Sequence, residues 1–98
     1  MAKQIVRLYV LGYSPIARRA IENLKLLCQQ PEFSNIYDTE VINLLDQPSL
    51  AEEEKILATP VLIKKLPEPM RRIIGDLSDR ERVLVGLDIF TKDHGTQA

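Results

Sequence analysis

Apolar residues fill both faces of the first predicted element of the chain. Residues 4–11 read QIVRLYVL, and Arg7 is the only charged residue among them. A strand with one solvated face alternates apolar and polar residues, whereas a strand covered on both sides is apolar throughout. The pattern therefore predicts an interior strand with both faces covered.

A helical pattern follows this strand. Ser14 and Pro15 suit the N-cap and the first helical position, because a serine hydroxyl can accept from a free backbone N–H and proline has none to satisfy. The predicted helix runs to about Gln29. Its apolar residues recur three and four positions apart and form one stripe, made of Ala17, Ala20, Ile21, Leu24, Leu27 and Cys28.

A second strand and a short helix are predicted after a loop at residues 31–35. Residues 37–45 form the strand, and a helical crossover of this length makes it parallel to the first. Ser49 and Glu52 have the spacing of a capping box, so a short helix to Leu57 should follow.

The C-terminal half contains two more strands and a last helix. Residues 60–66 and 71–74 are predicted strands joined by a tight turn at 67–69, which makes them an antiparallel pair. Ser78 opens a second capping box, and the helix after it should run to about Phe90.

The predicted order of elements is βαβαββα, which is the thioredoxin-like α/β architecture. Residues 1–98 form a single predicted domain, with a frayed tail at 91–98. Thr59 precedes a proline and is therefore kept out of the helical region. Pro60 can adopt the cis isomer and starts the third strand, so we interpret the Thr59-Pro60 loop as a feature of the fold.

Composition and charge narrow the classes of partner. The 98 residues are 45% hydrophobic and 28% charged, with a net charge of −1, so no basic footprint for nucleic acid is indicated. No apolar run approaches the roughly 18 residues of a membrane span. The single cysteine, Cys28, excludes an internal disulfide and fits a reducing compartment. We expect a cytoplasmic protein that binds neither nucleic acid nor membrane.

The residues argue against catalysis. In the thioredoxin-like fold a reactive cysteine lies at the N-terminus of the first helix, where the dipole lowers the pKa of the thiol. Residues 12–17 contain no cysteine, and Cys28 lies at the far end of the helix on its apolar stripe. Ser14 has no base nearby, and His94, the single histidine, lies in the tail. We therefore expect a protein that is not an enzyme.

Neither a metal site nor a cofactor site is predicted. Glu52, Glu53 and Glu54 form a carboxylate run without a histidine partner, which is typical of a solvated helix face. One histidine and one cysteine cannot form a zinc cluster. The four glycines stand alone, so no phosphate-binding loop is predicted.

Four basic residues adjoin in the predicted antiparallel pair. Lys64 and Lys65 end one strand, and Arg71 and Arg72 start the next. Such residues protect an edge strand from unwanted pairing, and arginine is also favoured at protein interfaces. Both interpretations stay open.

The last segment fits two secondary structures. Residues 83–90 carry an apolar stripe at helical spacing, and residues 83–89 also alternate at strand spacing. Gly86 costs a helix about 1 kcal/mol relative to alanine, and Asp88 near the C-terminal end of a helix opposes its dipole. A local conflict of this kind is expected of a sequence that can adopt two folds.

Three longer segments and two short ones carry a specific signature. They are RLYVLGYSP at 7–15, LAEEEKILATP at 50–60, RRIIGDLSDRERVLVGLD at 71–88, Leu66-Pro67 and Pro69. They are distributed between residues 7 and 88 and closely resemble the KaiB family of cyanobacterial circadian-clock proteins, and the resemblance extends over nearly the whole chain.

This resemblance implies a non-catalytic regulator that binds the N-terminal ATPase ring of a KaiC-type kinase and helps to sequester KaiA. It also implies two folds, namely a resting homotetramer with the element order βαββααβ and a rarer thioredoxin-like monomer that binds the ring. The residues expected to bind a partner are Arg7, Arg19, Lys64, Arg71 and Arg72. The residues expected at the fold switch are Thr59, Pro60, Gly86 and Asp88.

The chain departs from the family pattern on the half expected to meet KaiC and KaiA. Tyr13, Ile16 and Ala17 stand in a loop that is usually polar, and Glu40 and Asp46 replace basic residues. The alternative interpretation is a divergent paralogue, that is, a thioredoxin-like adaptor or a chaperone-like stress protein that works without KaiC. A thiol enzyme or glutathione-binding domain is a third alternative, which the missing nucleophile opposes.

Overall fold

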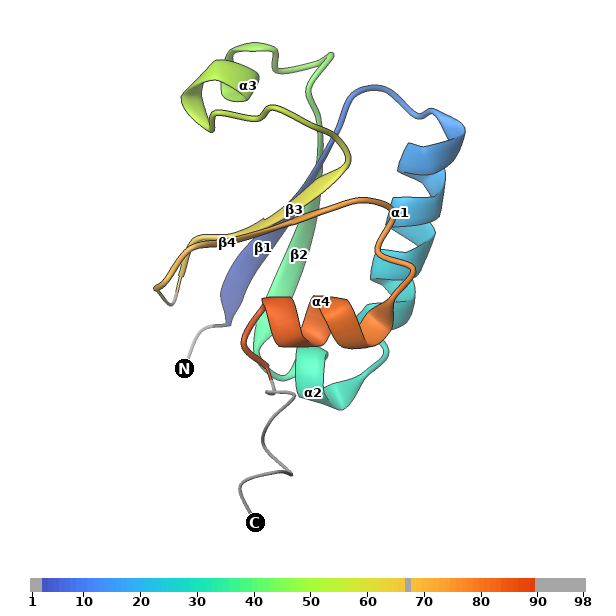
Figure 1. Ribbon diagram of the computed structural model, residues 1–98, viewed down its shortest axis with the longest axis vertical. Helices are drawn as coiled ribbons and strands as arrows, with labels where there is room; N and C mark the ends of the chain where they lie inside the picture. Colours follow the sequence, from blue (N-terminus) through green and yellow to red (C-terminus); the bar gives the residue numbers. More distant parts are fainter. Residues whose placement is uncertain (1–2, 67, 90–98) are drawn as a thin grey trace.

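The computed structural model describes residues 3–66 and 68–89, which form a mixed four-stranded sheet with helices on both faces (Figure 1). In chain order the elements are β1 (Gln4–Val10), α1 (Pro15–Leu27), α2 (Pro31–Ser34), β2 (Tyr37–Asn43), α3 (Ser49–Glu53), β3 (Val61–Lys64), β4 (Arg71–Ile74) and α4 (Arg80–Gly86). The strands lie in the order β2-β1-β3-β4. β1 is parallel to β2 and antiparallel to β3, and β3 is antiparallel to β4. This arrangement confirms the predicted thioredoxin-like fold.

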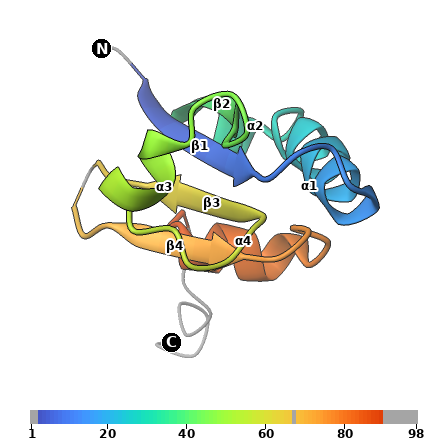
Figure 2. The same cartoon turned by 90° about the horizontal axis from the view of Figure 1, so that it is seen from above.

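The two faces of the sheet carry different cores. α1 and α4 lie together on one face (Figures 1 and 2), where their apolar residues pack with Val6, Leu8 and Val10 of β1. α3 lies at one end of the other face, where Leu50 belongs to a smaller cluster around Tyr9. Among the described residues, no helix has the length and apolar character needed to cross a membrane.

β1 is central in the sheet, as predicted, but only one of its faces is fully covered. Val6, Leu8 and Val10 are completely buried on the side of α1, whereas Ile5 on the opposite side is 43% exposed. The prediction of two covered faces is wrong for this end of β1. The reason is that α3 has only five residues and packs around Tyr9.

The start of α1 confirms the predicted cap. The hydroxyl of Ser14 accepts a hydrogen bond from the N–H of Ala17 at 3.3 Å, and Pro15 is the first helical residue. The loop predicted after α1 instead contains the short helix α2, which starts at Pro31 and buries Phe33 in the main core. Four residues are too few to show helical periodicity, and the proline at the first position was the one available signal.

Both predicted capping boxes are wrong in detail. The N-cap of α3 is Pro48, and Ser49 lies inside the helix. The N-cap of α4 is Asp79, whose Oδ1 accepts from the N–H of Arg82 at 3.1 Å. Aspartate and serine are about equally good N-caps. The sequence Ser78-Asp79 therefore did not determine which of the two residues caps α4.

Two helices also end earlier than predicted. α3 ends at Glu53 and not at Leu57. α4 ends at Gly86, and Phe90, its predicted end, lies outside the described residues, as does the tail at 91–98.

The Thr59-Pro60 loop leads into β3, as predicted, and its peptide bond is cis. Pro60 is buried, and its carbonyl accepts a hydrogen bond from the N–H of Gly75 at 2.9 Å. The loop is thereby attached to the residue that follows β4.

Candidate partner-binding surface

The predicted basic cluster is divided between the two faces of the sheet. Lys64 lies opposite Arg71 in the β3–β4 pair, and Ile63 lies opposite Arg72. Because successive residues of a strand point to opposite faces, Lys64 and Arg71 lie on the side of α1 and α4. Arg72 and Lys65 lie on the side of α3. The four basic residues therefore do not form one patch.

Lys64 is buried and paired in this fold. Its ammonium group lies 3.4 Å from Oδ2 of Asp88, and Arg71 donates from Nε to the same oxygen at 2.9 Å. A lysine is buried at tolerable cost only when it is paired. The hydrogen bond from Arg71, followed by the one from Lys64, lowers the pKa of Asp88 below its ordinary value. In this fold Lys64 supports the structure and is closed to a partner.

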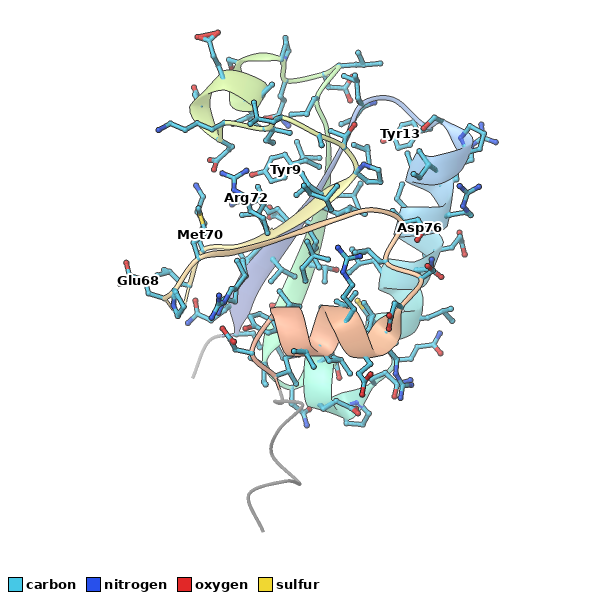
Figure 3. The ribbon with its side chains drawn as sticks, in the orientation of Figure 1. Tyr9, Tyr13, Glu68, Met70, Arg72 and Asp76 are labelled. Carbon is cyan, nitrogen blue, oxygen red and sulfur yellow. The ribbon has the colours of Figure 1, made fainter. Side chains whose placement is uncertain are left out.

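Arg72 and Lys65 hold α3 against the sheet. Arg72 donates to the carbonyl of Glu54 at 2.5 Å and to that of Lys55 at 3.3 Å, so it caps the free carbonyls at the end of α3. Lys65 donates to the carboxylate of Glu54 at 2.7 Å. In Figure 3, the side chains of Arg72 and Tyr9 both point from the sheet toward α3.

Arg7 also lies on the α3 side, next to the edge strand β2. It is opposite Glu40 in the parallel β1–β2 pair, and its Nε donates to Oε1 of Glu40 at 2.7 Å. This hydrogen bond raises the pKa of the Arg7 guanidinium. Glu40, one of the departures from the family pattern, is thus the ion-pair partner of Arg7.

Arg19 lies on the exposed face of α1 and contacts the loop between β4 and α4. Its Nε lies 3.4 Å from Oδ2 of Asp76, while Asn23 donates to the carbonyl of Asp76 at 2.8 Å. Hydrogen bonds from Ser78, and then the one from Arg19, lower the pKa of Asp76. The side chain of Arg19 is 59% exposed, so it is the most accessible of the predicted partner-binding arginines that carry an ion pair.

Gly86, one of the predicted fold-switch residues, sits where α4 packs against β4. A Cβ atom at this position would lie 3.0 Å from Cδ1 and 3.2 Å from Cγ1 of Ile73. The glycine therefore permits the close approach of α4 to Ile73, in addition to its cost in helix propensity.

Asp88 was predicted within the last helix, and this is wrong. It follows α4, with a φ of 63°, which is the left-handed region that aspartate tolerates better than most residues. Its carboxylate is held by Lys64 and Arg71. In this fold its neighbours are therefore two cations as well as the carbonyl end of α4.

The position of a thioredoxin active site is occupied by apolar residues. Tyr13 is 53% exposed and Ile16 is 40% exposed at the start of α1, while Ala17 is buried. Cys28 lies at the other end of α1, half-buried, with its Sγ 3.6 Å from the hydroxyl of Thr39. Figure 3 shows Tyr13 at the end of the molecule where α1 starts.

The described parts of the chain contain no candidate metal site. Residues 3–66 and 68–89 contain no group of three or more histidine, cysteine, aspartate or glutamate side chains placed to hold a metal ion. His94 lies outside the described residues.

Two exposed leucines were not singled out from the sequence. Leu57 is 98% exposed just before the Thr59-Pro60 loop, and Leu45 is 64% exposed after β2. Leu45 lies against the loop after β1, because a Cβ atom on Gly12 would be 3.2 Å from its Cδ1. The shortness of α3 leaves Leu57 outside the helix in which it was predicted.

Comparison with known sequences gives one consistent result. The model of the KaiB domain family matches residues 7–89. The chain is 58% identical over 86 residues to the circadian clock oscillator protein KaiB of Prochlorococcus marinus subsp. pastoris, covering 88% of this chain and 79% of that protein. It is 55% identical over 89 residues to the protein of the same name from a Nostoc species, covering 91% of this chain and 82% of that protein.

Solved structures resemble this fold at lower identity. The solution structure of the N-terminal domain of Synechococcus elongatus SasA has a TM-score of 0.68 and 26% identity, and covers 90% of this chain and 87% of that chain. The crystal structure of chloroplastic thioredoxin z has a TM-score of 0.70 at 14% identity, and the match covers 89% of this chain and 78% of that chain. The similarity to thioredoxin z concerns the fold alone.

Proposed function

The chain belongs to the KaiB family, and from this premise we propose that it is a non-catalytic regulator of a circadian clock. The observation that carries the proposal is the identity of 55–58% to KaiB clock proteins over 88–91% of the chain. The absence of a cysteine in residues 12–17, where a thioredoxin-like enzyme would carry its nucleophile, supports a role in binding. We also propose that it works in the cytoplasm.

The proposed partner is the N-terminal ATPase ring of a KaiC-type kinase, bound by the thioredoxin-like form, with KaiA sequestered on the complex. Arg19 supports this assignment as an exposed cation on α1, and Arg7 as a cation beside the edge strand β2. Lys64 and Arg71 would contribute indirectly, by holding the end of α4 through Asp88.

We further propose that the chain changes fold, resting as a homotetramer with the order βαββααβ. Residues 83–89 support this, since they fit both helical and strand spacing. In the thioredoxin-like form α4 comprises only seven residues, and it is followed by Asp88 in the left-handed region. Thr59, Pro60, Gly86 and Asp88 are the residues proposed to take part in the change.

One observation favours a second candidate, a thioredoxin-like adaptor that works without KaiC. Glu40 is paired with Arg7 on the edge strand, so this edge is less basic than the family pattern leads one to expect. A partner adapted to the edge would therefore differ from the usual one.

Size-exclusion chromatography with light scattering tests the proposal directly. The chain is run alone and with a KaiC-type ATPase ring from the same genome. We expect a homotetramer alone and a complex of chain and ring after incubation. A chain that never joins the ring, at concentrations well above those at which clock proteins associate, would contradict the clock assignment and favour the adaptor.

A further inference from the structure

A groove on the open face of the sheet has basic walls and an apolar floor. It lies between β1 and β3, beyond the part of this face that α3 covers, and has a volume of about 270 Å³. Three basic side chains line it, from Lys3, Arg7 and Lys65, and none of its lining residues is acidic. The sequence did not indicate this groove, because its basic residues come from segments far apart in the chain.

The apolar floor lies between these cations. Arg7 is opposite Ile63 in the β1–β3 pair, and continuing this register by one residue places Ile5 opposite Lys65. Ile63 is buried, while Ile5 is 43% exposed and Leu66 at the mouth is 54% exposed. An apolar group lying on this floor would have a cation on either side.

Each cation is oriented by an acid that lies outside the groove. Nζ of Lys3 lies 3.9 Å from Asp38, and Arg7 and Lys65 lie 2.7 Å from Glu40 and Glu54. These pairs leave donors available. Arg7 uses Nε for Glu40 and also interacts with the Tyr9 side chain, but a guanidinium has five N–H donors, so some of its Nη hydrogens can still donate into the groove. A lysine ammonium likewise has three hydrogens to donate.

We propose that this groove binds an acidic segment of a protein partner. An apolar side chain of the segment lies on Ile5 and Leu66, and the carboxylates beside it pair with Arg7 and Lys65. The inference deepens the proposed function, since it rests on the chain acting by binding another protein. Charge decides the occupant, because the cations line the groove while their acidic partners lie outside it. A carboxylate of the segment that enters the groove therefore meets cations only, whereas a basic group is repelled and a neutral one gains no ion pair.

Two matched peptides test the groove on the full chain. They are acetyl-Glu-Leu-Phe-Glu-amide and acetyl-Gln-Leu-Phe-Gln-amide, which differ only in two carboxylates, titrated into the nitrogen-15-labelled protein. We expect amide shifts concentrated on Ile5, Arg7 and Lys65. The acidic peptide should bind about fivefold tighter or more, which is the factor that two exposed ion pairs can supply.

Matched variants locate the effect. Lys65→Gln and Leu66→Ser change the groove, whereas Lys25→Gln and Leu26→Ser change exposed residues of α1. Leu26 is 58% exposed against 54% for Leu66, and the side chain of Lys25 is 68% exposed against 49% for Lys65. We expect the groove variants to weaken binding of the acidic peptide severalfold and the α1 variants to leave it unchanged. Lys65→Gln should also remove most of the difference between the two peptides.

Three results would overturn the proposal: equal binding of both peptides, shifts that map to another face, or no saturable shift up to several-millimolar peptide. The titration contains no ATPase ring, so its failure is distinct from that of the proposed function. A chain that joins the ring but ignores both peptides refutes the groove alone. A chain that binds the acidic peptide in the groove but never joins the ring refutes the clock assignment alone.

Discussion

The carboxylate of Asp88 lies 3.4 Å from the ammonium group of Lys64, which is the one buried charged side chain in the described parts of the chain. Lys64 ends β3, and Asp88 follows the last turn of α4. The pair therefore fastens the end of α4 to the sheet, at the segment whose pattern fits both a helix and a strand. Arg71 binds the same carboxylate from β4.

A double-mutant cycle measures this link. Asp88→Asn should lower the free energy of unfolding of the thioredoxin-like form, because it replaces the charged partner of a buried lysine by a neutral one. The same change in a Lys64→Met background should cost less, because the buried ammonium group that needs this partner is then absent. Urea unfolding of the four proteins gives the values. Strictly additive effects would show that the pair contributes nothing.

The stability of this fold should decrease in acid. The folded-state pKa values of Asp76 and Asp88 are both lowered, by Ser78 and Arg71 respectively. Their contribution is therefore complete above the unfolded pKa of about 4 and is lost as the pH falls through the lower folded values. Asp76→Asn and Asp88→Asn should each reduce the loss of stability on acidification.

Gly86→Ala should stabilise α4 by less than the roughly 1 kcal/mol expected from helix propensity. The new methyl group would lie 3.0 Å from Cδ1 of Ile73, which must move aside. In an Ile73→Val background that Cδ1 is absent, so the gain from Gly86→Ala should be larger. Urea unfolding of the four proteins checks this expectation. An equal gain in both backgrounds would mean that Ile73 relaxes freely.

Cys28→Ser should affect mainly stability. The thiol is half-buried, and its one described polar contact is the Thr39 hydroxyl at 3.6 Å, so we expect a cost of about 1 kcal/mol. Binding to the ATPase ring should be unchanged. An insulin-reduction assay supplies the second readout. Thiol–disulfide exchange by the natural chain that disappears in Cys28→Ser would contradict a non-enzymatic function.

Arg19→Gln should weaken binding to a KaiC-type ring without changing the far-ultraviolet dichroism spectrum. Arg19 is exposed, and its ion pair with Asp76 is a surface pair that contributes little to stability. Arg18→Gln on the same helix is the matched control. Titration by biolayer interferometry compares the two, and equal affinities for the ring would assign Arg19 to a solvated helix face.

Local sequence was sufficient for most of the secondary structure. Both β1 and α1 are long enough to show their periods, and Ser14-Pro15 marks the start of α1 without help from the rest of the chain. The order of elements then limits the topology, because a helix between two neighbouring strands allows them to be parallel, with a right-handed crossover, and β1 and β2 are parallel. The resemblance to the KaiB family was likewise detected from the sequence alone, in residues 7–15, 50–60 and 71–88.

Short elements were beyond such reasoning. α2 has four residues and α3 has five, which is too few for a helical period, so tertiary packing determines them. The burial of Phe33 in the main core and the capping of α3 by Arg72 both depend on contacts between residues far apart in the chain. Nothing within a local window encodes them.

The sequence by itself determined which residues carry charge, and only the tertiary structure decided what each charge does. Lys64 and Lys65 are neighbours in the chain. Lys64 is buried and paired with Asp88, whereas Lys65 lines a groove together with Arg7. The physical reason is the pleat of a strand, which sends adjacent side chains to opposite faces of the sheet. What meets them on each face, α4 on one and the short α3 on the other, depends on how the whole chain packs.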